Sequence, residues 1–288
     1  MVSYAPALTQ IIVDLGAADT LVAVAENDAA APKDIPLAGN YLDLDTEVLL
    51  TMRPTHVMMM YGQGGVPQVL TDLAKGQGFE LITYPYPQNV ADVEQIIWSS
   101  DDAAGTRPMD APPSIAFVLE RQAAGRMLGF SISSTVGQLG ALAEDRGKHK
   151  SVLMLFNTNP PMASGPGTVL DDMLTMLLRA DNAVGGGDAT GSAPELDKEM
   201  LLTMNPDVIL LLLPNAPPLT ALADDPRLAV FRDMNITAVR DQRIVLINDP
   251  LVLLPSSSSV RIGIKMAKAI YPELIGDFDK VLAQSDAP

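Results

Sequence analysis

Asp45-Thr-Glu-Val-Leu-Leu-Thr-Met-Arg-Pro54 and Asp197-Lys-Glu-Met-Leu-Leu-Thr-Met-Asn-Pro206 are two copies of one ten-residue unit, 152 residues apart, with seven identical positions. Each copy continues into an apolar run, Val57–Met60 or Val208–Leu213, and then into a loop rich in Gly or Pro. A repeat that occurs only twice indicates two duplicated lobes and not a solenoid.

Each copy predicts a short helix, a proline turn and a buried strand. The leading aspartate can cap the helix, and the Glu two residues later lies in the first turn, where negative charge suits the helix dipole. We expect Leu49-Leu50 and Leu201-Leu202 to form the buried side of the two helices. The closing proline disfavours helical geometry in the residue before it and so ends the helix. A continuous apolar run of four to six residues is typical of a strand that is covered on both faces of a parallel sheet.

The same alternation of strands and helices extends along the chain. Strands are expected near 2–4, 21–24, 57–60, 79–83, 152–156, 208–213 and 243–247. Helices are expected near 9–15, 66–75, 115–144, 169–178, 219–231 and 260–270. This order predicts an α/β fold with parallel sheets and helices on both faces. We divide the chain into an N-terminal α/β lobe over 1–113, a connecting helix over 114–147 and a C-terminal α/β lobe over 148–288.

Composition limits the function classes. The 288 residues are 48% hydrophobic and 19% charged, as in an ordinary folded protein, and the net charge is −16. Nucleic acid and anionic membranes would be repelled and are therefore not expected as partners. The absence of cysteine excludes disulfides, thiolate metal sites and a cysteine nucleophile. No apolar run is long enough to span a membrane. No charged-then-apolar leader precedes Ser3, so we expect the signal of an exported protein to have been removed.

The residues that an enzyme would use do not group in the sequence. His56 opens an apolar strand and His149 lies in a polar run, and neither has a carboxylate at a catalytic spacing. The adjacent pairs Asp101-Asp102 and Asp171-Asp172 do not face one another on a helix or loop. Gly165-Pro-Gly-Thr168 precedes a helix, but the acids in the following turn suit an ordinary helix start better than an anion site. We predict no catalytic residues and no protein-bound metal.

Aromatic side chains gather where the predicted strands end. Ligands of doubly wound sheets bind at the loops that follow the carboxyl ends of strands. These loops hold Tyr4, Tyr41, Tyr61, Tyr84 and Tyr86 in the first lobe, and Phe156 and Met162 in the second. Aromatic groups with a polar tip can pack a large flat ligand and also hydrogen-bond it. The alternative for several of these tyrosines is a turn position that covers loop backbone.

Ala7-Leu-Thr-Gln-Ile-Ile-Val-Asp-Leu-Gly-Ala-Ala-Asp19, followed by Leu21–Val24, resembles the opening helix and strand of the substrate-binding proteins of ABC importers for metal chelates. That family handles vitamin B12, ferric siderophores and haem. The duplicated unit looks like the acidic, Leu-Leu, Pro and strand element that the family carries in both lobes. Met162–Thr168 and Asp181–Ala183 resemble its second-lobe loop and helix. The resemblance covers nearly the whole chain.

The resemblance implies two Rossmann-like lobes that are bridged by a long helix, with a small-molecule metal chelate held in the cleft between them for an ABC permease. The chelate would be cobalamin, a ferric siderophore or haem, so any iron or cobalt belongs to the ligand and the protein has no intrinsic cofactor. We expect a monomer in the periplasm or elsewhere outside the cytoplasm. The candidate ligand-binding residues are Tyr4, Ala5, Tyr41, Tyr61, Gly62, Tyr86, Phe156, Asn157, Met162, Pro214, Asn215 and Asp249.

The sequence departs from the family's pattern at the expected docking and ligand positions. Members commonly carry a Glu on each lobe that docks on permease arginines. Here the first position shows Pro67-Gln68, with Asp72 one turn further, and Asp224 or Asp225 stands near the second. Ser256–Ser259 replaces the Gly-Pro-Arg turn that is common in haem and siderophore binders. The docking residues and the identity of the chelate therefore stay open.

Two other functions stay open at this stage. One is a lobe-duplicated α/β enzyme or chelatase, which would need His56 and nearby carboxylates to converge in the cleft. The other is a sensor that keeps the fold but has lost transport.

Overall fold

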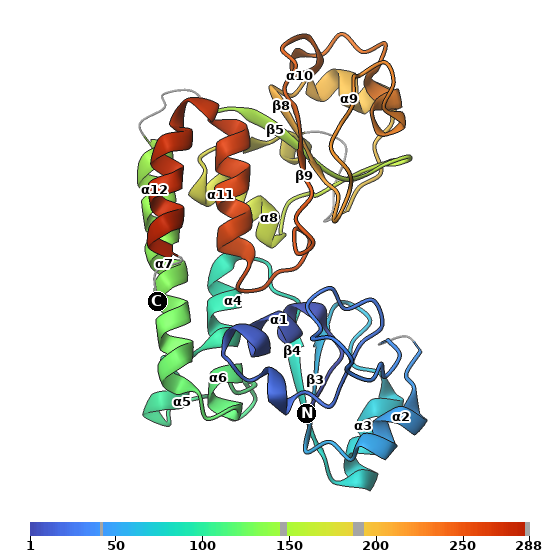
Figure 1. Cartoon of the computed structure of the whole chain (residues 1–288), viewed down its shortest axis with the longest axis vertical. Helices are drawn as coiled ribbons and strands as arrows, with labels where there is room; N and C mark the ends of the chain where they lie inside the picture. Colours follow the sequence, from blue (N-terminus) through green and yellow to red (C-terminus); the bar gives the residue numbers. More distant parts are fainter. Residues whose placement is uncertain (41–42, 145–148, 187–192, 286–288) are drawn as a thin grey trace. The chain divides into compact units, whose positions relative to one another are not determined.

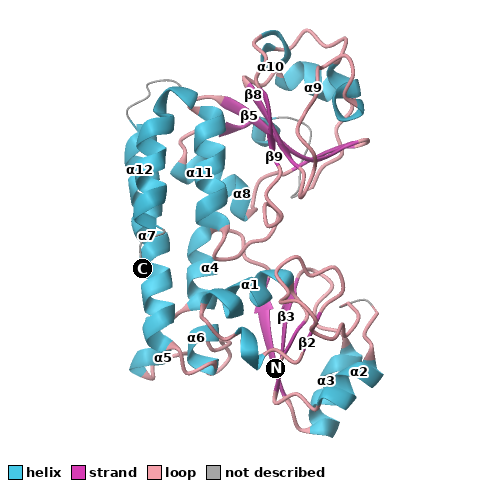
Figure 2. Ribbon diagram, in the orientation of Figure 1, coloured by secondary structure: helices cyan, strands magenta, loops and turns pink. Residues whose placement is uncertain are grey.

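The computed structural model describes residues 1–40, 43–144, 149–186 and 193–285, and it divides into two compact units (Figure 1). Unit 1 comprises Met1–Pro87 and Ala91–Phe130, and unit 2 comprises Gln88–Val90 and Ser131–Pro288. Each unit holds a sheet with helices around it (Figure 2), which confirms the predicted α/β fold class.

The sheet of unit 1 has the strand order β2-β1-β3-β4, and all of its pairs are parallel. Its strands are β1 (Val2–Ser3), β2 (Ala23–Val24), β3 (His56–Tyr61) and β4 (Glu80–Pro85). The helical segments around it are α1 (Pro6–Asp14), η1 (Ala18–Thr20), α2 (Thr46–Met52), α3 (Gln68–Gln77), α4 (Val90–Ile97), α5 (Ser100–Ala104) and α6 (Ile115–Val118). Alternate strand residues separate the two faces. Val57 and Met59 of β3 pack in one apolar cluster with Leu49 of α2 and Leu70 of α3. On the other face, α1 contacts β1 and β3.

The sheet of unit 2 has the order β6-β5-β8-β9, with β7 paired to β5. Its strands are β5 (Ser151–Thr158), β6 (Pro161–Ala163), β7 (Asp181–Asn182), β8 (Val208–Leu212) and β9 (Ile244–Ile247). All pairs are parallel except β5–β6. The helical segments are α8 (Val169–Asp172), η2 (Met173–Leu177), η3 (Ala183–Gly186), α9 (Lys198–Met204), η4 (Pro226–Phe231), α10 (Thr237–Arg240), α11 (Ser259–Ile270), η5 (Pro272–Leu274) and α12 (Ile275–Ser285).

Every residue of β8 is buried, as its continuous apolar sequence predicts. Ile209 and Leu211 pack in a cluster with Leu201 of α9 and Phe231 of η4. The alternate residues face the opposite layer, where α11 contacts β8 and β9. Helices therefore cover both faces of this sheet, as predicted.

The two copies of the duplicated unit fold in the same way. Asp45 Oδ1 accepts from Val48 N at 2.9 Å, and Asp197 Oδ1 accepts from Met200 N at 2.8 Å, so each aspartate caps a seven-residue helix. Both helices end on a residue in the left-handed region, Arg53 or Asn205, immediately before the proline. One expectation for these helices is wrong: only the first leucine of each pair is fully buried, and Leu50 is 37% exposed.

Other local expectations also need correction. The predicted helix over 219–231 is only the 3-10 segment Pro226–Phe231, because the preceding loop is fixed by side-chain bonds from Asp225. The continuous helix over 115–144 is broken, since Glu120 has φ 57° between α6 and α7 (Gln122–Glu144). The division between the units falls inside α7. The segment 99–113 was expected to be irregular, yet Ser99 caps α5 there.

Candidate functional site

The carboxyl ends of β1, β3 and β4, which we call the unit 1 edge, bring several predicted residues close together. Backbone bonds tie the strand ends: Tyr4 N donates to Met58 O at 2.8 Å and Tyr86 N donates to Tyr61 O at 2.9 Å. Tyr61 is partly exposed, Gly62 is exposed and Tyr86 is 53% exposed. Tyr61 and Tyr86 therefore end neighbouring strands and offer accessible aromatic surface.

Other predicted residues of unit 1 lie behind this edge. Tyr4 is 4% exposed and packs in the apolar cluster of β3 and α2. Its hydroxyl is buried without a hydrogen-bond partner among the described residues. Burial, with Asp45 nearby, raises the pKa of Tyr4 to about 12. Ala5 is 8% exposed and precedes α1. Tyr41 lies outside the described residues.

Tyr84 is not a surface tyrosine. It is 1% exposed, and its hydroxyl donates to Pro113 O at 2.8 Å. Burial raises the pKa of its phenol well above the ordinary value. The loop expected at 84–87 is in fact partly strand, because β4 pairs with β3 as far as Pro85. Tyr84 therefore acts as a core residue that anchors the segment before α6.

The carboxyl ends of β5, β8 and β9, with the adjoining β6, form what we call the unit 2 edge. Asn157 pairs with Met162 in the antiparallel register of β5 and β6. Phe156, Asn157 and Met162 are partly exposed, whereas Pro214 and Asn215 are exposed. Asn215 N donates to Asn248 O at 3.0 Å. The structure thus places five predicted residues along one edge.

Asp249, the sixth predicted residue of unit 2, is 5% exposed and has two cationic partners on α11. Arg261 Nε donates to its Oδ2 at 3.2 Å, and Lys265 Nζ donates to the same oxygen. Burial raises the pKa of the carboxyl, but the bonds from Lys265 and Leu251 N, together with the charge of Arg261, outweigh burial and lower it overall. Sequence reasoning missed both cations, although their spacing of four residues places them on one helix face.

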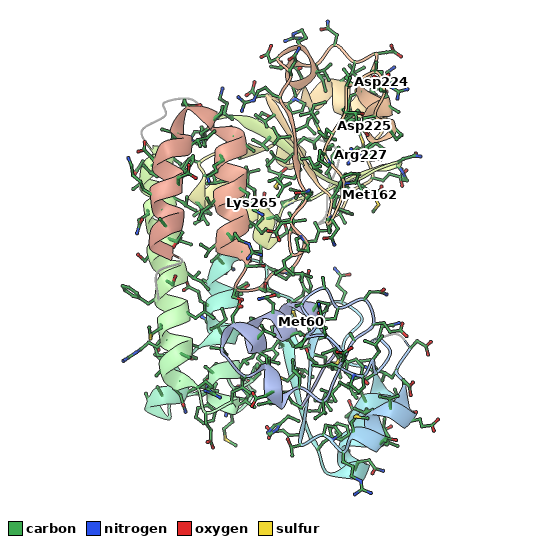
Figure 3. All side chains as sticks on the ribbon, in the orientation of Figure 1. Met60, Met162, Asp224, Asp225, Arg227 and Lys265 are labelled. Atoms are coloured by element: carbon green, nitrogen blue, oxygen red, sulfur yellow. The ribbon has the colours of Figure 1, made fainter. Side chains whose placement is uncertain are left out.

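A second ion pair fixes the loop that follows β8. Arg227 Nε donates to Asp225 Oδ1 at 2.8 Å, and Arg227 also donates to Pro217 O at 2.7 Å and Pro218 O at 3.0 Å. These bonds hold the pKa of the Asp225 carboxyl well below its ordinary value. Figure 3 marks Asp225 and Arg227 with the neighbouring Asp224. Asp225 is thus engaged within its own unit, whereas Asp224 is exposed.

The histidines lie away from both edges. His56 begins β3, at the amino end of the unit 1 sheet, where it contacts Thr55 and lies 3.6 Å from Glu80. His149 Nδ1 lies 3.1 Å from Asp181 Oδ1, next to the amino ends of β5 and β7. Across the described residues, no three His, Asp or Glu side chains group as metal ligands. The base that an enzyme would need is therefore not at the unit 1 edge.

Two parallel α/β units, each with accessible aromatic or amide groups at the carboxyl edge of its sheet, define the architecture of a bilobal binding protein. The chain matches the family described as Periplasmic binding protein over residues 1–251, and it belongs to that family. None of the helices in the described ranges has the length and apolar character of a membrane span.

Solved structures share the fold across almost the whole chain. The periplasmic haem-binding protein RhuT from Roseiflexus sp. RS-1, in its apo form, has 20% identity and a TM-score of 0.70, covering 94% of this chain and 97% of that one. The periplasmic haem-binding protein HutB of Vibrio cholerae has 23% identity, a TM-score of 0.72 and coverage of 94% and 98%. The periplasmic vitamin B12-binding protein BtuF of Vibrio cholerae has 16% identity, a TM-score of 0.67 and coverage of 94% and 96%. No curated protein sequence matches the chain.

Proposed function

We propose that this protein is a monomeric substrate-binding protein that captures a metal chelate outside the cytoplasm and delivers it to an ABC permease. Membership of the periplasmic binding protein family carries the proposal. The similar folds include proteins described as binding haem and vitamin B12, both of which are large, flat metal chelates. Cobalamin, haem and ferric siderophores are accordingly the candidate ligands, and the ligand brings its own metal.

The accessible residues of the two edges are the proposed contacts. In unit 1, Tyr61 and Tyr86 present aromatic surface that suits a planar ring system. In unit 2, Asn157 and Asn215 offer amide donors and acceptors beside the apolar Met162. Tyr4 and Ala5 contribute from below the surface, where the unpartnered Tyr4 hydroxyl has hydrogen-bonding capacity to give.

A catalytic role has less support. His56 sits at the amino end of β3, six residues along the strand from Tyr61, and its nearest carboxylate belongs to Glu80 at the same amino end. A general base must reach the proton that it removes, within about 3 Å or through one water. We therefore propose binding without catalysis.

The direct test is a titration of the full chain with haemin, cyanocobalamin and several ferric siderophores, followed by tyrosine and tryptophan fluorescence. We expect at least one Kd below about 100 μM, which corresponds to roughly 5.5 kcal/mol. Tyr61→Ala should weaken binding of that chelate about tenfold, because an aromatic contact contributes about 1 kcal/mol beyond its buried area.

Phe130→Ala is the matched control, since Phe130 is an aromatic residue of α7 that is 74% exposed and belongs to neither edge. Its affinity should equal that of the unmodified protein. If no member of the panel binds below about 100 μM, the proposed function is wrong.

A further inference from the structure

The unit 2 edge contains a pair of cations on one buried carboxylate. Asp249 follows β9 and is 5% exposed, so its charge is held inside the protein. Its Oδ1 accepts from Leu251 N at 2.9 Å and from Arg261 Nη2 at 3.3 Å. Its Oδ2 accepts from Arg261 Nε at 3.2 Å and from Lys265 Nζ. Both carboxylate oxygens are therefore fully engaged.

Charge and donors remain after these bonds are made. Two cations oppose one carboxylate, so the group has a net charge of about +1 at neutral pH. A guanidinium has five N–H donors and an ammonium has three, and only part of each set reaches Asp249. The side chains of Arg261 and Lys265 are 47% and 43% exposed, so the unused donors are open to solvent or to a ligand.

The surrounding loops of the same edge provide no other cation. The segments 156–168, 213–225 and 248–260, which follow the strands β5, β8 and β9, contain neither lysine nor arginine. The chain as a whole carries a net charge of −16. A cationic pair that a buried acid holds in place is thus a local exception in an acidic protein (Lys265 is labelled in Figure 3).

Asp249 also restricts the geometry of the pair. Arg261 and Lys265 are one helical turn apart on α11, and each is tied to the same carboxylate. A long cationic side chain that is already held loses less conformational entropy when it binds a second anion. The buried carboxylate therefore prepares the two cations for a ligand and is itself covered by them.

We propose that Arg261 and Lys265 bind an anionic oxygen group, such as a carboxylate, on the chelate, and that Asp249 is a positioning residue for them. This inference rests on the proposed function and narrows it: among chelates of similar size, the protein selects one with negative charge at its periphery.

The test compares chelates in matched pairs with the full chain. Haemin is paired with its dimethyl ester, cyanocobalamin with its monocarboxylic acid, and a ferric tricatecholate siderophore with the cationic ferrioxamine B. We expect the anionic member of the pair that binds to be preferred at least tenfold at low salt, with the preference falling as salt screens the charges. Lys265→Gln and Arg261→Gln should each reduce the preference several-fold.

Lys268→Gln is the matched control, because Lys268 lies on the same helix but pairs with Asp279. It removes the same charge and should leave the preference unchanged. Lys265→Arg keeps the charge and should retain most of the preference. This variant also guards against a Lys265→Gln protein that fails to fold, since the loss of a partner leaves Asp249 less well paired.

The outcomes separate the two claims. If a chelate binds but its anionic and uncharged or cationic forms bind equally, or if Lys268→Gln lowers the preference as much as Lys265→Gln, this inference is wrong and the proposed function stands. If the unmodified protein binds no chelate, both fall together.

Discussion

In both copies of the duplicated helix, the first leucine is buried and the second is partly exposed. Leu49 and Leu201 are fully buried, each in the apolar cluster of its own unit. Leu50 is 37% exposed and Leu202 is 43% exposed. The two leucines of a pair have the same chemistry and adjacent positions, so they differ only in what surrounds them.

This contrast predicts unequal effects of the same substitution. Leu49→Ala and Leu201→Ala should each lower the free energy of unfolding by about 3 kcal/mol, because the lost methyl groups leave a cavity in a packed cluster. Leu50→Ala and Leu202→Ala should cost less than about 1 kcal/mol, since part of the side chain is already in water and alanine is the better helix former.

Urea unfolding measures the difference. Trp98, the single tryptophan, belongs to unit 1, so its fluorescence follows the unit that contains Leu49 and Leu50. Far-UV circular dichroism follows the variants of Leu201 and Leu202. Equal costs for the two leucines of one pair would show that the assigned helix face, and with it the packing of the duplicated unit, is wrong.

Two further predictions concern buried polar groups. Tyr4→Phe removes an unpartnered hydroxyl, so at neutral pH the variant should be at least as stable as the unmodified protein in urea unfolding. Because the pKa of Tyr4 is raised from 10.0 to about 12, its neutral phenol stabilises the fold below pH 10, and this contribution is lost as the pH rises through about 12; the variant should show a smaller alkaline loss. Arg227→Ala releases the carbonyls of Pro217 and Pro218, so limited proteolysis should cut the loop after β8 several-fold faster. Arg240→Ala, at an exposed arginine elsewhere in unit 2, should leave the cutting rate unchanged, and an equal rate in Arg227→Ala would contradict the clamp.

Local chemistry determined most of the fold from the sequence. The capping aspartate, the proline after each helix and the apolar run each act within a few residues, so the helix–turn–strand unit could be predicted in both copies. The position of His56 at the amino end of β3 follows from the same pattern, because the apolar run begins immediately after it. The order of strands and helices then predicted parallel sheets.

Only the tertiary structure decided which polar and aromatic residues are buried, and by what. Tyr4 and Tyr84 follow the same alternation as accessible tyrosines, and their burial depends on α2 and on Pro113, which are distant in sequence. The loop position of Asp249 was predictable, but its engagement by Arg261 and Lys265 required α11 to pack beside β9. Burial and ion pairing are long-range contacts, and a pattern along the chain shows which face a residue is on, not what lies opposite that face.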